Sequence, residues 1–443
     1  MKKLTLVATA IMGLLSTTAA MAQSTVTIYG VLDGGYNRVT GLRNGTANHI
    51  ASGIIEGSRF GLRGTEDIGG GYKAIFTLEN RFELDTGSVT NRAPSGGQVP
   101  DRLVQGNMVL PTVGGVPFGL LPAATQGALQ TALNIAAYGN AAGTPGTAGG
   151  LGSSIGVNTA GNLFDRQAFA GLITPFGAFT LGRQYTPGYI VGASFDASQT
   201  ESSLAAGQVG SFPPAFDIRL SNTIQYGIKL DGLTAALMYG AGEVAGAGNS
   251  ASRFYGGMAM YKANGWGAGI GYNARNNELG QKSLTNSVVG ASIDIGPGAL
   301  YGQWATVKDE NPSGVSGIAA ALTAASPALA GVAPIVQAGI INGLKQDANL
   351  MHIGYRLTSG VHTVVVAYSR YDDKKAADND TSSYGVRYTY ALSKRTSLNA
   401  VLTRFSNKNQ AQAAPGGNGF LGGVTANAGV DSTNIALGIR HTF

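Results

Sequence analysis

The sequence predicts an all-β protein: a transmembrane antiparallel β-barrel of 16 strands, with short periplasmic turns and long external loops. Three observations lead to this fold class: a secretory N-terminal segment, apolar residues spread over short stretches, and a two-residue alternation of side chains. Only 12% of the 443 residues are charged, and 68 are glycine. Because only helices and closed barrels pair every backbone group in a bilayer, a membrane chain without spanning helices is predicted to be a barrel.

The N-terminal segment has the layout of a signal peptide. Lys2 and Lys3 open it, residues 4–15 are largely apolar, and small residues surround Met21. We therefore expect residues 1–22 to be cleaved and residues 23–443 to form the barrel. A permanent anchor is the alternative, but this apolar run is shorter than the roughly 20 residues of a spanning helix.

Charge and cysteine content argue against several other classes of protein. Without Lys2 and Lys3 the chain keeps 28 basic and 24 acidic residues, and it has no cysteine. An excess of positive charge this small argues against a nucleic-acid partner, which needs a concentrated basic face. A secreted chain without disulfides must gain its stability elsewhere.

The alternation is clearest at the C-terminus. Ile435, Leu437 and Ile439 share one face of a strand with His441 and Phe443, while polar or small residues occupy the other face. Residues 383–392 and 223–230 repeat the pattern. This period places one set of side chains on lipid and the other in the lumen. A soluble β-sandwich would alternate in the same way, but the signal segment and the number of strands favour the barrel.

The connections between strands can be read from glycine, proline and polar residues. Seven tight turns are predicted at residues 69–71, 175–177, 231–232, 264–265, 296–298, 359–360 and 393–395. Eight longer loops are predicted at residues 39–55, 86–162, 186–217, 241–252, 274–283, 308–347, 372–381 and 406–431. These connections divide the chain into sixteen strands, enough to leave an aqueous channel.

Two of these loops are long insertions. Residues 103–164 and 311–344 run for 62 and 34 residues without a charge. We expect loops 86–162 and 308–347 to be external, the first with a short helix over residues 127–138. A transmembrane helix is the alternative for residues 311–344, but Pro327 and Pro334 interrupt it. The insertions could cover the pore mouth or contact a neighbouring subunit.

Several motifs, in this order, resemble the general porins of Gram-negative bacteria, of the betaproteobacterial type. They are VTIYGVLD at residues 26–33, SRFGLRGTEDIGGG at 58–71, KAIFTLEN at 73–80, FDRQAFAGL at 164–172, TLGRQY at 180–185 and LGIRHTF at 437–443. The resemblance spans the mature chain except the insertions. It implies a homotrimer of barrels in the outer membrane, each forming a water-filled channel for passive diffusion of ions and small hydrophilic solutes.

The resemblance also implies a constriction. The third external loop, residues 186–217, is expected to fold inward and to carry Asp196 and Glu201 into the channel. Matching of motifs then places constriction arginines at the positions Arg59, Arg166 and Arg219.

Strand parity adds Arg63 to the lumen face. Opposed charges would create a transverse field and a weak preference for anions. The alternative is that these arginines only pair with wall acids such as Asp33, Glu79 or Asp294.

The terminal Phe443 is expected to be an assembly signal, as in the family that the sequence resembles. The implied partners are outer-membrane lipid, lipopolysaccharide, periplasmic chaperones and the barrel assembly machinery. We predict no catalytic residue, cofactor or metal, since the four histidines lack the spacing of metal ligands. Two alternatives remain: a substrate-specific channel of the same fold, and a barrel enzyme or adhesin, of which a hydrolase would need an outward Ser–His pair.

Overall fold

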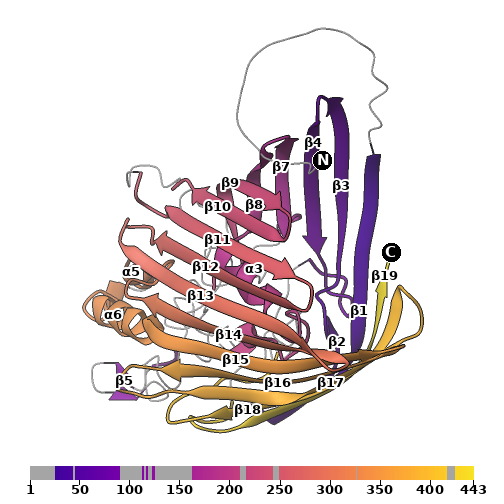
Figure 1. The fold of residues 1–443 in the computed structure, drawn as a ribbon. Helices are drawn as coiled ribbons and strands as arrows, with labels where there is room; N and C mark the ends of the chain where they lie inside the picture. Colours follow the sequence, from indigo (N-terminus) through magenta and orange to yellow (C-terminus); the bar gives the residue numbers. More distant parts are fainter. Residues whose placement is uncertain are drawn as a thin grey trace.

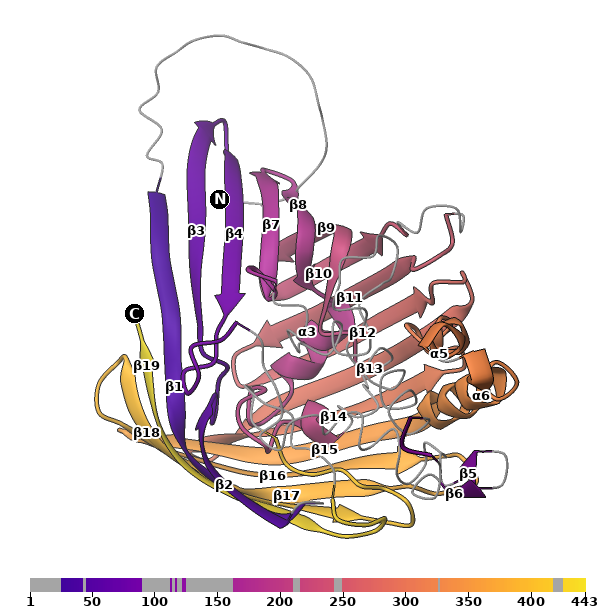
Figure 2. The ribbon, with the colours of Figure 1, turned by 180° about the vertical axis from the view of Figure 1, so that it is seen from behind.

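The computed structural model describes residues 25–42, 45–89, 112–113, 116–117, 122–124, 162–209, 216–242, 249–325, 327–416 and 425–443. Its antiparallel strands form one large sheet that closes on itself, because β1 (Thr25–Leu42) pairs with β19 (Ser432–Thr442). Figures 1 and 2 show the barrel from opposite sides. The other strands of the barrel are β2 (Gly45–Ser52), β3 (Arg59–Gly69), β4 (Tyr72–Arg81), β7 (Gln167–Thr174), β8 (Gly177–Tyr185), β9 (Arg219–Leu230), β10 (Leu233–Gly240), β11 (Phe254–Ala263), β12 (Trp266–Asn276), β13 (Lys282–Ile295), β14 (Gly298–Asp309), β15 (Gln346–Ser359), β16 (His362–Asp373), β17 (Thr381–Ala391) and β18 (Thr396–Asn407).

The barrel has sixteen strands, as predicted, although its second strand is split in two. β2 pairs with the second half of β1 and β3 with the first half, so together they occupy one place in the barrel. Residues 53–58 form the gap between them. The carboxylate of Asp33 on β1 accepts hydrogen bonds from the backbone N–H groups of Ile54, Ile55 and Glu56, at 2.8, 3.2 and 2.9 Å. These bonds hold the gap segment against the inner wall.

All seven predicted turns join neighbouring strands, from β3–β4 to β17–β18. The turn between β9 and β10 contains Asp231 and Gly232, and Gly232 has φ of +85°. A side chain at such a φ is strained, which explains why glycine stands there. The tight turns thus gather at one end of the barrel, and the long connections lie at the other.

One predicted loop, residues 39–55, is wrong. β1 continues to Leu42 and β2 begins at Gly45, so most of that range is paired strand. Its polar and glycine residues hid the strands, because side chains need not alternate where a hairpin rises beyond the lipid. The remaining long loops fall between the predicted strands.

Inward and outward faces differ as the alternation predicted. Along β12, Ile270 and Tyr272 are exposed on the outer surface, whereas Gly271 and Asn273, which alternate with them, are buried on the inside. Tyr, Trp, Leu, Ile and Val dominate the exposed large side chains around the barrel. Such a surface is stable only against lipid.

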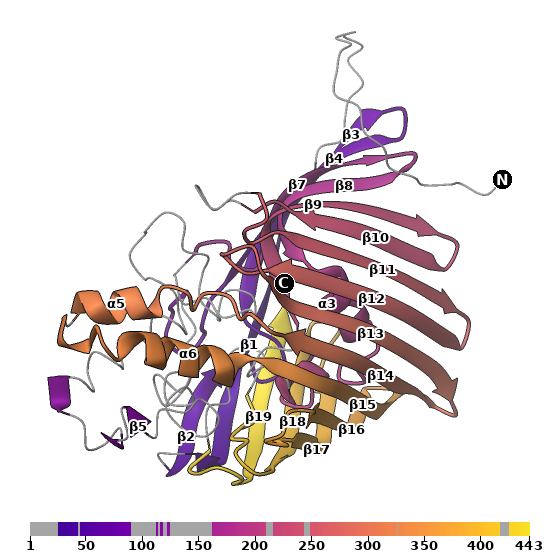
Figure 3. The same cartoon turned by 90° about the vertical axis from the view of Figure 1, so that its left-hand side faces the viewer.

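The second insertion, between β14 and β15, is built from short helices. They are α5 (Ile318–Ala325), the 3-10 turn η3 (Pro327–Leu329) and α6 (Ala333–Leu344), and α5 packs against α6. Figure 3 shows both helices at the end of the barrel opposite the tight turns. In the described part of the chain, none of the helices has both the length and the apolar character needed to cross a membrane.

Glu278, in the neighbouring connection between β12 and β13, ties this insertion to the barrel. Its carboxylate accepts hydrogen bonds from the backbone N–H of Gly314 at 2.9 Å and of Ser316 at 3.1 Å. Burial raises the pKa of Glu278, but the hydrogen bonds from Ser316 and Gly314 outweigh burial and hold the pKa below its usual value. This anchor therefore persists at neutral pH and weakens only as pH falls through the lowered pKa.

Part of the sequence analysis lies outside the described residues. This holds for the predicted signal peptide, residues 1–22, for the predicted helix at 127–138, and for most of the first insertion, of which the short hairpin of β5 (Thr112–Val113) and β6 (Val116–Pro117) is described.

The C-terminal residue generates a first prediction. Phe443 and Gly30 exchange backbone hydrogen bonds of 3.1 and 3.2 Å at the closing seam. Deleting Phe443 leaves these groups unpaired, so we expect less folded barrel in the outer membrane, measured as the fraction that migrates as folded species in unheated gel samples. Phe443→Trp, which keeps the seam and an aromatic ring, serves as the control. Equal amounts of folded barrel in the deletion variant and the wild type would contradict a role of Phe443 in assembly.

The insertion generates a second prediction. Replacing residues 315–343 with a short glycine–serine linker should leave a barrel that inserts and conducts, because β14 and β15 are already adjacent and a change of loop length costs little entropy. Insertion is measured by heat modification and by conductance in planar bilayers. If the shortened protein failed to insert, the two helices would be part of the membrane-spanning structure.

Candidate pore constriction

The connection between β8 and β9 turns into the barrel instead of away from it. Thr186 begins the helix α3 (Pro187–Ser194), and its hydroxyl accepts a hydrogen bond from the N–H of Tyr189 at 3.4 Å. A second short helix, α4 (Ala206–Val209), follows. α3 contacts β10 to β13, and α4 contacts β15 to β17. Figures 1 and 2 show α3 within the ring of strands. We call the described residues 186–209 the inward segment.

α3 is held on one wall by apolar packing against glycines. Val191 and Phe195 pack into a buried cluster with Met260 and Val288 of the wall. A Cβ atom at Gly290 would lie 2.6 Å from the Cβ of Phe195. The lumen face of the wall therefore needs glycine beneath this helix, and no room is left for water between them.

The rest of the inward segment is fastened by hydrogen bonds to β15, to the gap of the second strand and to β19. The N–H of Ala197 donates to Nε2 of His352 on β15 at 3.0 Å. The N–H of Ser202 donates to the carbonyl of Ile55 in the gap of the second strand, also at 3.0 Å. The hydroxyl of Ser203 donates to Oδ1 of Asn434 on β19 at 2.9 Å. The segment thus crosses the lumen and narrows it.

Asp196 does not face the predicted arginines. It is buried, and its carboxylate accepts hydrogen bonds from the N–H groups of Ser198 at 2.8 Å and Ala206 at 2.9 Å. One of its oxygens lies 3.5 Å from Nε2 of His352. Its contacts brace the turn of the inward segment.

Glu201 has a different partner from those expected. It forms an ion pair with Arg387 of β17, whose guanidinium also donates to the carbonyl of Ser198 at 3.2 Å. Only 1% of the Arg387 side chain is exposed, against 20% for Glu201, so the pair is largely shielded from bulk water. Arg356 of β15 interacts electrostatically with both Glu201 and Arg387.

The structure brings three of the predicted arginines together on the wall. Glu79 of β4 accepts a hydrogen bond from Nε of Arg166 at 2.6 Å and lies 3.8 Å from Nε of Arg59. Arg166 and Arg219 both donate to the hydroxyl of Tyr185, each at 3.0 Å, and Arg219 stacks on its ring at 4.5 Å. The pairing with Glu79 matches the alternative in which wall acids neutralise part of this charge.

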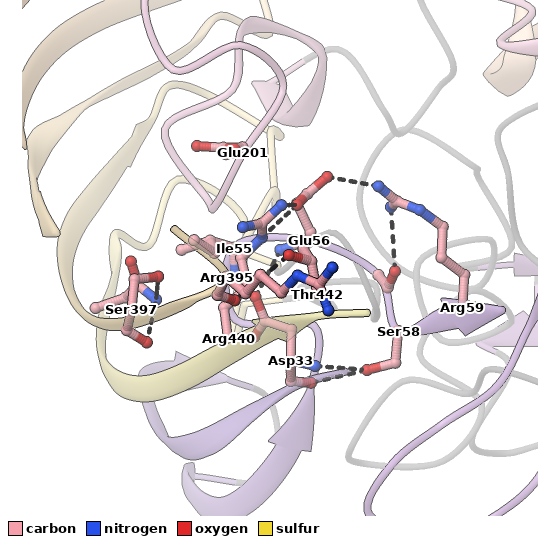
Figure 4. Close-up of polar contacts among 12 residues, drawn as sticks. Asp33, Ile55, Glu56, Ser58, Arg59, Glu201, Arg395, Ser397, Arg440 and Thr442 are labelled. Carbon is pink, nitrogen blue, oxygen red and sulfur yellow. Dashed lines mark hydrogen bonds and ion pairs between the residues drawn. The ribbon is translucent and has the colours of Figure 1, made fainter. Parts of the chain in front are cut away.

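Arg59 also takes part in a second charged group. Glu56, in the gap of the second strand, pairs with Arg59 at 2.7 Å and with Arg440 of β19. Figure 4 shows Glu56 between these two arginines, with Glu201 nearby. The remaining predicted residue, Arg63, is exposed and lies over the ring of Tyr29 at 5.1 Å.

Sequence reasoning missed three arginines that interact with the acids of the inward segment or the gap: Arg356, Arg387 and Arg440. A signal was present, because Arg387 and Arg440 have lumen parity on their strands and Arg440 lies within the C-terminal motif. Their significance depends on the inward segment and the gap reaching them, which parity alone does not reveal.

His352, which accepts the hydrogen bond from Ala197, also belongs to a buried Ser–His–Asp arrangement. Nδ1 of His352 lies 2.8 Å from the hydroxyl of Ser369, and Asp196 lies on the other side of the ring. Because the N–H of Ala197 donates to Nε2, the proton of a neutral His352 is on Nδ1 and points at Ser369. The histidine therefore has no free nitrogen to accept the serine proton, and all three residues are buried. This arrangement lacks the geometry of a hydrolase site.

Comparisons with known proteins match this architecture. The family model described as Gram-negative porin matches residues 7–410. The chain belongs to that family. This porin is 26% identical to outer membrane porin protein 32 of Delftia acidovorans over 440 residues, which covers 96% of each chain. It is 30% identical over 254 residues to an outer membrane porin protein of Bordetella pertussis, covering 49% of this chain and 65% of the relative.

A solved structure shows the same fold. The anion-selective porin from Comamonas acidovorans superposes with a TM-score of 0.64 and 23% identity, covering 95% of this chain and all of the other. The family and the closed barrel place this porin in the outer membrane of a Gram-negative bacterium, where it forms a channel.

The fastening of the inward segment generates a third prediction. Arg387→Gln removes one partner of a largely shielded ion pair, so we expect a loss of about 3 kcal/mol of unfolding free energy and larger fluctuations of single-channel current. Arg404→Gln, which breaks an exposed pair with Asp431, should cost less than about 1 kcal/mol and leave the current steady. Urea unfolding and planar-bilayer recording measure both effects. Equal effects of the two substitutions would show that the Arg387 pair does not hold the segment.

Proposed function

We propose that this porin is a passive diffusion channel with a weak preference for small anions, that it works as a homotrimer, and that it carries no catalytic activity. Residues 1–22 would direct its export, and the terminal Phe443 would direct its assembly. The inward segment sets the width of the channel, and the arginines around it set the preference for anions.

The excess of arginine over acid around the inward segment carries this proposal. Among the described residues, five acidic side chains contact the inward segment, the gap or these arginines: Asp33, Glu56, Glu79, Asp196 and Glu201. The arginines are more numerous, and they come from both walls: Arg59, Arg63, Arg166, Arg219, Arg356, Arg387 and Arg440. Because the arginines outnumber the acids, the net charge of the groups around the constriction is positive.

A positive potential in a narrow passage with low-dielectric walls concentrates anions and depletes cations. Arginine suits this role because it stays charged at every physiological pH and keeps a fixed planar geometry. The channel contains water, so salt screens these charges, and the preference should fade as ionic strength rises. The similarity to the anion-selective porin from Comamonas acidovorans supports this direction of selectivity.

Reversal potentials supply the test and a fourth prediction. Replacing Arg59 and Arg63 together with Gln should shift the reversal potential in a salt gradient toward cations, with little change in conductance, because the inward segment and its fastenings remain. Lys394→Gln, in the turn between β17 and β18, removes a charge far from the constriction and should leave the reversal potential unchanged. If the double variant kept the wild-type potential, these arginines would be neutralised wall residues and the assignment would fail.

A further inference from the structure

His352 is a buried histidine that joins the inward segment to the wall. Its side chain is fully buried, and its Nε2 accepts the hydrogen bond from the N–H of Ala197 at 3.0 Å. Its Nδ1 lies 2.8 Å from the hydroxyl of Ser369 on the neighbouring strand. Histidine changes charge near neutral pH, and a charged ring carries a proton on both nitrogens. A charged His352 therefore cannot accept the hydrogen bond that holds Ala197.

Asp196 offers a second partner to the same nitrogen. Its Oδ1 lies 3.5 Å from Nε2 of His352, which is within ion-pair distance but longer than an ordinary hydrogen bond. This oxygen also accepts hydrogen bonds from the N–H and the hydroxyl of Ser198, at 2.8 and 2.7 Å. Because Asp196 and Ala197 are adjacent in the chain, a small local shift exchanges one contact for the other. A neutral ring holds Ala197, and a charged ring holds Asp196.

The other groups around His352 leave this site close to neutral. Gln303 of β14 pairs with His352 in the sheet and is uncharged. Two arginines and two acids surround the ring, and Glu201 is already paired with Arg387. A proton on His352 therefore changes the local net charge by a full unit. Among the described residues, the titratable groups on the elements packed here are Asp196, Glu201, Tyr301, Arg356, Tyr371 and Arg387.

The turn after Asp196 is held in a strained conformation. Gln199, Thr200 and Ser202 have φ of +56°, +62° and +65°, in the left-handed region that residues other than glycine rarely adopt. Such a conformation persists only where the surrounding contacts impose it. Loss of the hydrogen bond at Ala197 removes one of these contacts, so the strain favours a second position of the turn.

We propose that His352 is a proton-sensitive switch for the position of the inward segment. At neutral pH the ring accepts from Ala197 and holds the segment. As pH falls, Nε2 takes a proton from the channel water, turns to Asp196 and releases Ala197, so that the turn moves within the lumen. This inference rests on the proposed role of the inward segment in setting the channel width, and it is independent of the direction of ion selectivity.

Single-channel recording of the full-length protein at several pH values tests the switch. In the wild type we expect partial closures to become about fivefold more frequent between about pH 7.5 and pH 5.5, because the segment loses one hydrogen bond. His352→Gln supplies an amide oxygen that can accept from Ala197 but takes up no proton, so its closures should not depend on pH. His362→Gln, at the exposed turn end of β16, is the matched control and should respond as the wild type does.

A disulfide tests whether movement of the segment causes the response. The chain has no cysteine, and the hydroxyl oxygens of Ser203 and Thr403 lie 2.7 Å apart. Ser203→Cys combined with Thr403→Cys should therefore link the inward segment to β18 and remove the pH response until dithiothreitol restores it.

Three results would overturn the proposal: a wild type without a pH response, a His352→Gln variant that keeps the wild-type response, or a bridged protein that responds without reductant. The reversal potential, measured in the same recordings, tests the anion preference separately. A reversal potential that ignores the arginines would count against the proposed selectivity and leave the closures as the measure of the switch.

Discussion

The structure depends on one constraint: within a bilayer, every backbone N–H and C=O group must find a partner in the protein. The pairing of β1 with β19 meets this constraint by removing the last open edges of the sheet. Closure at once creates two surfaces with opposite requirements. Side chains that alternate along each strand must be apolar outside, and inside they are free to be polar, charged or glycine.

The freedom of the inner surface is used to hold a piece of chain across the channel. Glycines beneath Val191 and Phe195 let α3 lie close to the wall, while His352, Arg387 and Asn434 on β15, β17 and β19 bind the following residues. Apolar packing and polar fastening act on different ends of the same segment, so neither alone would fix its position. The acids of the segment, Asp196 and Glu201, are bound in these fastenings.

The gap in the second strand has a comparable part in the constriction. The break between β2 and β3 removes backbone pairing at residues 53–58. Three hydrogen bonds from backbone N–H groups of this segment to Asp33 offset that loss. In return the gap carries Glu56 to Arg59 and Arg440, and it offers the carbonyl of Ile55 to Ser202. Wall, gap and inward segment therefore form one connected polar network around the channel.

The sequence by itself determined the barrel, the number of strands, the positions of the seven turns and the lumen parity of the arginines. Those features follow from local rules: a period of two residues, the conformational needs of tight turns, and the match between outward side chains and lipid. It misjudged residues 39–55, where strands rise beyond the lipid and the alternation is no longer required. Only the tertiary structure decided which acid meets which arginine. Glu79 with Arg166, Glu201 with Arg387 and Glu56 with Arg440 join residues from 87 to 384 positions apart, so their pairing is set by barrel closure and by the path of the inward segment, which no local pattern records.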